Sequence, residues 1–204
     1  MSKRRMAGLL GALLLGGALA IGVSGGLAAT AHAADPVVPS DTWNEIFVPF
    51  DNGQGNTMCV DVPGGTSTQG AQLQFFHCHG YASNGAPQRW HFLAFNTSII
   101  QNGVVVYTGP VYKLQNVGNG LCIGFTGFFA AADVRLIQTT CSEGIEWRIK
   151  PENDNGTNPL LALSPILSDS ICMAAGDLTD RNSTPLMSRF CDGFQDAAQI
   201  LELG

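Results

Sequence analysis

Charged residues are scarce in this sequence, and basic residues are the scarcest. Only 13% of the 204 residues are charged, with 10 basic against 16 acidic side chains and a formal net charge of −6. Proteins that bind nucleic acid carry basic clusters that neutralise phosphates. This charge balance therefore argues against nucleic acid as a partner.

Long hydrophobic runs are absent except at the N-terminus. Three basic residues at positions 3–5 precede an Ala/Leu/Gly-rich run over residues 7–29, and Ala31-His32-Ala33 places small residues around a cleavable bond. This pattern is typical of a secretory signal peptide, which we predict over residues 1–33. The run is long enough to span a bilayer, so an uncleaved anchor is the alternative. We expect a secreted protein without membrane association after cleavage.

The part that follows the predicted signal peptide is more acidic than the whole chain. It keeps seven basic and sixteen acidic residues, a formal net charge of −9. Its 171 residues suit one domain with a hydrophobic core. Residues 34–40 contain two prolines and no periodic pattern, so we expect a flexible lead-in there and a single domain over residues 41–204.

Six cysteines form the most regular pattern in the chain. They fall into three pairs in which the second cysteine follows the first by 19 positions: Cys59/Cys78, Cys122/Cys141 and Cys172/Cys191. An even number of cysteines in an exported chain indicates disulfides rather than free thiols or zinc ligands. Six cysteines allow 15 connectivities, and the repeat favours the one in which each copy closes its own loop.

The three copies also share apolar positions. Three positions, counted from the cysteines, are apolar in every copy: Met58/Leu121/Ile171, Val60/Ile123/Met173 and Leu73/Leu136/Leu186. Near equivalent places stand the triplets Gln88-Arg89-Trp90, Ile145-Glu146-Trp147 and Gln199-Ile200-Leu201. A structural repeat reproduces its buried positions, so we infer a threefold internal repeat, with copies at about residues 41–95, 108–150 and 158–204.

The mature chain lacks any long helical period and instead has short runs separated by turns. We predict strands at residues 46–50, 58–62, 72–77, 103–107, 111–115, 121–125, 134–139 and 146–149, many of them rich in branched or aromatic residues. Turn residues such as Pro63-Gly64-Gly65 and Gly118-Asn119-Gly120 lie between them. Three copies of a unit too small to bury a core alone imply a closed all-β architecture with approximate threefold symmetry.

The first repeat resembles the ricin B-chain-type lectin family. The likeness is carried by Cys59-Val60-Asp61-Val62-Pro63-Gly64-Gly65, by Gln74-Phe75-Phe76-His77-Cys78 and by Gln88-Arg89-Trp90. It extends over essentially the whole mature chain through the cysteine spacing and the apolar positions. The resemblance implies a secreted, actinobacterial-like single-domain member of that family: a β-trefoil of twelve strands, with a disulfide in each repeat and up to three shallow sugar sites.

Residues 73–77 and Asp61 outline a sugar site in repeat one. Because side chains alternate along a strand, Leu73 and Phe75 should point inward, and Gln74 and Phe76 outward. A pyranose has an apolar face that an aromatic ring covers and hydroxyls that carboxylates and amides bind. We predict that Asp61 is the carboxylate and Phe76 the platform, supported by Gln74 and Gln88. The resemblance implies the same principal contacts, and a further structural role for Gln88.

Alternative roles for the same residues remain open, and the site departs from the family pattern. Asp61 could only organise the following turn, Phe76 could lie under a loop, and Gln88 could bond only to backbone. Pro87 stands where the family commonly has a sugar-binding Asn, and it offers no donor. Asn84, in a loop with two extra residues, is a candidate substitute. Because Phe76 stands where Trp is usual, we expect weak binding, with a Kd of about micromolar to millimolar.

Repeats two and three depart further from the family pattern. The Asp61 position becomes Gly124 and Ala174, and the Phe76 position becomes Thr139 and Arg189. Neither repeat keeps both a carboxylate and a ring at these positions. We therefore expect scaffold in repeats two and three and a single sugar site in the chain.

The sequence gives little support to a metal site or to catalysis. His77, His79 and His91 are close in sequence, but a disulfide would occupy Cys78 and no carboxylate accompanies the histidines, so we predict no metal or cofactor. Glycoside hydrolysis needs two carboxylates about 5 to 10 Å apart. The acidic residues here are scattered, and none is paired by repeat position. We predict that the protein is not an enzyme.

Two classes of function therefore remain. The first is a carbohydrate-binding protein that recognises a glycan or polysaccharide through repeat one. The second is a secreted β-trefoil that binds a protein partner, as an inhibitor or accessory factor, without a working sugar site. The substitution Asp61→Ala should abolish glycan binding in the first case and leave partner binding unchanged in the second.

Overall fold

The computed structural model describes residues 43–48, 57–79, 86–127, 131–151, 161–166, 168, 170–176, 182–191 and 202–203. The predicted signal peptide and lead-in, Asn84 and the triplet Gln199-Ile200-Leu201 lie outside these residues. The described strands are β1 (Trp43–Val48), β2 (Met58–Asp61), β3 (Gln74–His77), β4 (Arg89–Gln101), β5 (Val104–Asn116), β6 (Cys122–Phe125), β7 (Val134–Thr139), β8 (Trp147–Pro151), β9 (Leu161–Pro165), β10 (Ile171–Ala175), β11 (Thr184–Phe190) and β12 (Glu202–Leu203). Two short 3-10 helices, η1 (Pro63–Gly65) and η2 (Ala86–Gln88), complete them.

The strand pairing repeats three times along the chain. The hairpins β2–β3, β6–β7 and β10–β11 recur at equivalent places, and β4–β5, β8–β9 and β12–β1 pair between them. All of these pairs are antiparallel. This is the arrangement of a β-trefoil, which confirms the fold class predicted from the internal repeat.

Each of the repeating hairpins is closed by its own disulfide. The bonds join Cys59 to Cys78, Cys122 to Cys141 and Cys172 to Cys191, with Cα–Cα distances of 5.0, 4.8 and 5.2 Å. The connectivity favoured by the repeat is therefore confirmed. Since the three loops have the same length, the disulfides constrain equivalent parts of the three copies.

The core is built from the apolar positions that the three copies share. Val60, Ile123 and Met173 are fully buried, and so are the three leucines at positions 73, 136 and 186. Trp90 and Trp147 are buried as well, and the indole N–H of Trp90 donates to the Val60 carbonyl at 3.0 Å. Each such apolar side chain stabilises the fold by about 1.5 to 3 kcal/mol. Leu121 is the exception, because it is only partly buried.

Gln72 lies where the three copies meet. Its Nε2 atom donates to the carbonyl oxygens of Leu73, Leu136 and Leu186 at 2.8, 2.9 and 2.8 Å. These three leucines occupy the same position in the three repeats. The backbone N–H groups of Leu73 and Leu186 donate to the carbonyls of Leu136 and Leu73 at the same place. One side-chain amide thus joins all three repeats at their pseudo-threefold axis.

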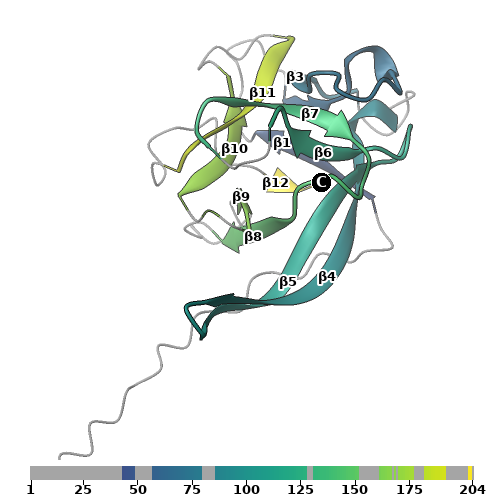
Figure 1. Cartoon of the computed structure of the whole chain (residues 1–204). Helices are drawn as coiled ribbons and strands as arrows, with labels where there is room; N and C mark the ends of the chain where they lie inside the picture. The colour runs from purple at the N-terminus through teal and green to yellow at the C-terminus, as the bar shows by residue number, and fades with distance from the viewer. Residues whose placement is uncertain are drawn as a thin grey trace, which may run out of the picture. The chain divides into compact units, whose positions relative to one another are not determined.

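The hairpin of β4 and β5 is the main departure from the predicted strands. Each strand has 13 residues, so the predicted runs 103–107 and 111–115 belong to one strand, and the sequence pattern does not predict β4. The hairpin extends away from the other strands (Figure 1). Asn102 and Gly103 adopt positive φ angles of 52° and 78°, as a tight two-residue turn between antiparallel strands requires.

Within the part of the chain that the structure describes, no helix has the length and apolar character needed to cross a bilayer.

Candidate sugar site in repeat one

The paired strands β2 and β3 bring Asp61 and Gln74 together. The two residues are opposite each other in the register, and Gln74 Nε2 donates to Asp61 Oδ1 at 2.7 Å. Leu73 and Phe75 are buried, whereas Gln74 and Phe76 are partly exposed, which confirms the predicted alternation of faces. The strand period therefore places the amide and the aromatic ring on the side where Asp61 ends β2.

An open hollow of about 610 Å³ lies over these residues. Three of the predicted site residues line it, together with the turn after β2 and two histidines: Asp61, Val62, Gly64, Gly65, Gln74, Phe76, His77, His79 and Pro87. Its size and its mixture of apolar and polar side chains suit a small ligand. Asn84, the candidate substitute for the usual Asn, lies outside the described residues.

The rim of the hollow depends on the contact of η1 with η2. The Val62 N–H donates to the Pro87 carbonyl at 3.1 Å, and Asn116 Nδ2 donates to the Ala86 and Pro87 carbonyls at 3.0 Å each. Gly65 has a φ of 64°, and a Cβ atom there would lie 3.2 Å from Pro87 Cγ. Glycine therefore fits this position both sterically and conformationally. Pro87 contributes an apolar ring where an amide is usual in the family that the sequence resembles.

Phe76 belongs to a cluster of three rings. The ring centroids of Phe76 and His77 are 4.4 Å apart, those of Phe76 and His79 are 5.5 Å apart, and those of the two histidines are 4.9 Å apart. Sequence reasoning considered His77 and His79 only as metal ligands and missed them as part of this surface. The sequence signal for this surface is that the two histidines flank Cys78 directly after Phe76.

Gln88 supports the site from inside the protein. It is fully buried, its Oε1 accepts from the His79 N–H at 2.8 Å, and its Nε2 donates to the His77 carbonyl at 3.0 Å. These bonds fix the backbone on either side of Cys78, whereas the His77 ring contacts Asn182 Oδ1 through Nδ1 at 3.3 Å. The backbone-binding role that the sequence left open for Gln88 is thus present, and Gln88 does not line the hollow.

The Asp61 carboxyl group is nearly enclosed, with 4% of its residue surface exposed. Burial raises the pKa of Asp61 above its ordinary value of 3.8, and this effect outweighs the hydrogen bond from Gln74 and the nearby His79, which lower it. Burial removes hydrating water from the carboxylate, and this loss is unfavourable for the charged form. A hydroxyl donor in the hollow would compensate for that loss, because a carboxylate is a strong acceptor.

A second hollow, of about 670 Å³, is lined by Thr139, Glu143 and other residues of repeat two and by Gln69 and Gly70 of repeat one. Thr139, at the Phe76 position, lines it, whereas Gly124, at the Asp61 position, does not. A Cβ atom on Gly124 would lie 2.6 Å from Thr139 Cγ2. Glu143 supplies a carboxylate from a different sequence position, and its Oε2 accepts from Thr139 Oγ1 at 2.8 Å and Gln69 Nε2 at 2.9 Å. The repeat alignment missed this carboxylate because Glu143 follows the second cysteine of its pair.

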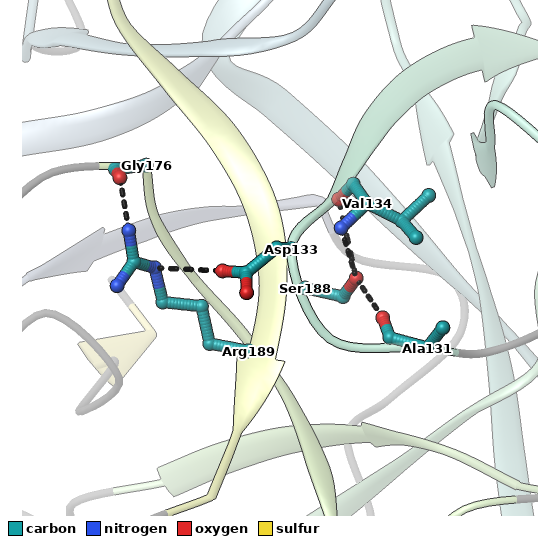
Figure 2. Close-up of polar contacts among 6 residues, drawn as sticks. All are labelled: Ala131, Asp133, Val134, Gly176, Ser188 and Arg189. Carbon is teal, nitrogen blue, oxygen red and sulfur yellow. Dashed lines mark hydrogen bonds and ion pairs between the residues drawn. The ribbon is translucent and has the colours of Figure 1, made fainter.

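Repeat three has Arg189 at the Phe76 position, and Figure 2 shows its contacts. The guanidinium donates to the Gly176 carbonyl, and Nε lies 4.0 Å from Asp133 Oδ1. The neighbouring Ser188 points to the other side of β11 and donates to the Ala131 carbonyl. Arg189 therefore ties β11 to the segments before β7 and after β10, and it provides no aromatic platform.

No group of three or more His, Cys, Asp or Glu side chains that could hold a metal ion occurs in the described ranges.

Comparisons with known proteins place this fold in a class. No protein-family model matches the sequence, and no curated protein matches it. The solved structures that are similar include ThreeFoil, a designed threefold symmetric protein, with a TM-score of 0.56 and 16% identity over 79% of this chain and 96% of that one.

Two further solved structures are similar to about the same extent. The ricin B-like lectin of Macrolepiota procera, in complex with lactose, has a TM-score of 0.56 and 16% identity, over 82% of this chain and 98% of its own. The Rhizoctonia solani agglutinin has a TM-score of 0.54 and 14% identity, over 83% and 98%. At such identities the likeness shows the fold alone, a β-trefoil.

Proposed function

We propose that this chain is a secreted carbohydrate-binding protein that recognises a pyranose through the hollow of repeat one. The observation that carries the proposal is the position of the Asp61 carboxylate, held by Gln74 at 2.7 Å and lining one hollow with the Phe76, His77 and His79 rings. Hydroxyls would donate to the carboxylate while the apolar face of the sugar covers a ring. Gln88 hydrogen-bonds to the backbone of both histidines.

The ligand is a glycan or polysaccharide, and its binding is weak. The Phe76 ring is smaller than an indole, and Pro87 contributes no hydrogen-bond donor. We expect a Kd of about micromolar to millimolar for a single site. Secretion is supported by the N-terminal sequence pattern and by three disulfides, which persist in oxidising compartments.

The test is a glycan and polysaccharide screen of the mature protein, Ala34 to Gly204, beside its Asp61→Asn variant. Asparagine keeps an acceptor for Gln74 and a similar shape but removes the charge. We expect the variant to bind at least about tenfold more weakly, since a hydrogen bond to a charged group contributes about 1.5 to 3 kcal/mol. Thermal unfolding of both proteins, with disulfides intact, would verify that the variant is folded.

Glu143→Gln is the matched control, because it removes the corresponding carboxylate from the hollow of repeat two. Under the proposal, repeat two is scaffold, and this variant keeps the affinity of the unmodified protein. Binding that survives Asp61→Asn but is lost in Glu143→Gln would move the site to repeat two. A folded mature protein that binds no glycan at all would refute the proposal.

A protein partner is the alternative function. In that case Asp61→Asn would leave the interaction unchanged, because the buried carboxylate is shielded from a large surface. Capture of partners from culture medium by the mature protein and by the variant would separate the two functions.

A further inference from the structure

The outer part of the β4–β5 hairpin pairs only with itself in the described residues. β1 pairs with β4 no further along than His91, and β8 pairs with β5 at Tyr112. From Phe92 to Val111 the two strands have only each other as strand partners, and they extend away from the rest (Figure 1). An isolated two-stranded ribbon is marginally stable in water. A further strand would therefore stabilise this one.

The ribbon is uncharged and exposes apolar side chains. Residues 92–112 contain no Asp, Glu, Lys or Arg, although 13% of the chain is charged. Ile100, Val104, Val105 and Val106, close to the turn, expose between 51% and 62% of their surfaces. Contiguous exposed apolar residues of this kind mark an interaction surface.

The two free edges of the ribbon differ in how well they are protected. β5 contains Pro110, which has no N–H, and a register shift leaves Val106 without a cross-strand partner. Prolines and irregularities of this kind prevent a further strand from pairing. β4 has no proline, glycine or charged residue from Phe92 to Gln101. Within the residues that the structure describes, the edge of β4 beyond His91 is therefore open to strand addition.

Neither lipid nor a partner selected by charge fits this edge. Open sheet edges do not occur in the hydrocarbon of a bilayer, because their N–H and C=O groups would stay unpaired. Polar side chains also lie midway along the ribbon, where Ser98 Oγ and Thr108 Oγ1 are 3.2 Å apart. Residues 92–112 of the ribbon carry no charge, and the two cations beside it, Lys113 and Arg148, already lie 6.0 and 4.5 Å from the centres of the Phe95 and Tyr107 rings. A partner selected by charge would therefore find no charged residue on the ribbon itself to complement.

From Ala94 to Ile100 the residue types of β4 are symmetric about Thr97. Ala94-Phe95 and Ile99-Ile100 are apolar, and Asn96 and Ser98 are polar, so the order of residue types in this stretch is the same in both directions. When two identical antiparallel strands are related by a two-fold axis, each residue faces the residue equally far beyond the axis in the other copy, so this pattern pairs apolar with apolar and polar with polar side chains. A second copy of the chain is the partner that this pattern matches.

We propose that two copies of this chain associate through the free edges of β4, antiparallel to each other, with Thr97 beside the two-fold axis. Asn96 then faces Ser98 of the second copy, and Phe95 faces Ile99. The two ribbons form a four-stranded sheet that contains no charged residue between positions 92 and 112, so the acidic chains meet without like-charge contacts in this sheet. The apolar residues near each turn extend the same contact.

This association is independent of the proposed sugar binding. If both hold, the dimer carries two copies of the repeat-one hollow. A weak single-site affinity would then be reinforced on a surface that presents several glycans, since the second binding event becomes intramolecular.

The experiment is to measure the molar mass of the mature protein by light scattering and sedimentation from about 1 µM to about 100 µM. Thr97→Lys is the test variant, because it places two like charges across the axis. Thr108→Lys is the matched control, with the same change on the same hairpin but on β5. We expect a dimer whose dissociation constant rises at least about tenfold in Thr97→Lys and less than about twofold in Thr108→Lys.

Mixing Thr97→Lys with Thr97→Glu provides a second measurement that does not depend on loss of association. The opposite charges should restore a dimer that contains one copy of each variant. A monomeric mature protein over the whole concentration range would overturn the proposal, as would a dimer that Thr97→Lys does not weaken. A protein that stays monomeric but binds neutral phosphatidylcholine vesicles would overturn it in favour of a lipid surface.

Discussion

Asp61 is a residue whose position costs stability. A carboxylate that is almost fully enclosed loses hydration, and one hydrogen bond from Gln74 compensates only part of that loss. Its pKa is therefore raised above 3.8. An Asp that only organised the turn after β2 could have stayed at the surface, where the same bonds are made without this penalty. The cost is consistent with selection for a ligand contact.

The raised pKa of Asp61 predicts a pH dependence of stability. The folded protein holds the Asp61 proton at pH values where the unfolded chain has released it, so the contribution of this group falls as pH rises from the unfolded pKa through the raised folded pKa. Asp61→Asn removes that contribution. We expect the stability of the variant relative to the unmodified protein to increase as pH rises from the unfolded pKa of Asp61 through its raised folded pKa, and then to level off.

Urea unfolding at a series of pH values would measure this difference. Glu143→Gln again serves as a control, because it removes the charge of an exposed carboxylate, and we expect it to give a much flatter difference over the same range. A stability difference between Asp61→Asn and the unmodified protein that decreased with rising pH would mean that hydrogen bonding, and not burial, dominates the Asp61 pKa.

Individual residues of the proposed site could be predicted only where the cysteine spacing or the alternation of a strand determines where their side chains lie. Asp61, Gln74 and Phe76 follow from the cysteine spacing and from the alternation of a strand, and the structure brings all three to one hollow. His79 and Glu143 lie in the segments after the second cysteine of each pair, where no strand period determines direction. Their positions depend on bonds such as that from His79 N–H to Gln88 Oε1, which no local pattern indicates.

At the scale of elements, strands with a clear local pattern were predictable. The run at residues 134–139 matches β7, and β2, β3, β6 and β8 are shifted only at their ends. β4 was missed because Asn96, Thr97 and Ser98 interrupt its apolar alternation, although its register with β5 continues through them. β10 and β11 were missed because Ala174 and Ala175 and then Pro185 weaken the strand signal. Cross-strand pairing, which is not local, determines all three.

The junction of β3, β7 and β11 predicts a further effect on stability. The amide of Gln72 bonds to the carbonyls of Leu73, Leu136 and Leu186, and the described bonds give the Leu186 carbonyl no other partner. Gln72→Met keeps the size of the side chain but leaves that carbonyl unpaired. We expect the free energy of unfolding to fall by about 1 to 3 kcal/mol, measured by urea unfolding.

Gln69→Met is the matched control for this prediction. Gln69 is exposed, and its amide bonds to Thr139 and Glu143 at the surface, where water can replace these partners. The control should change stability by no more than about 0.5 kcal/mol. Equal losses of stability in the two variants would indicate that the hydrogen bonds of Gln72 at this junction contribute no more than the surface bonds of Gln69.

At the scale of the whole molecule, the repeat explains why the fold was easier to predict than the site. The cysteine spacing and the apolar positions occur three times, so each copy supports the interpretation of the others. The positions of the proposed site differ between copies: a carboxylate and a ring in repeat one, Glu143 at another position in repeat two, and Arg189 in repeat three. Threefold symmetry is a property of the scaffold, and a site proposed in repeat one alone has no second copy to support it.

The same symmetry predicts that the three disulfides contribute equally to stability. Each closes a loop of 19 positions, and in each pair the first cysteine is buried and the second partly exposed. The chain-entropy estimate for such a loop is about 3 kcal/mol. Replacing each pair in turn by alanines should therefore lower the free energy of unfolding by about 3 kcal/mol, with the three variants within about 1 kcal/mol of one another. Urea unfolding of the three variants and the unmodified protein gives the comparison.

A much larger loss for the Cys59/Cys78 pair would show that this disulfide also holds the ring cluster of the hollow, because Cys78 lies between His77 and His79. In that case the site, and not only the scaffold, would depend on the repeat-one loop.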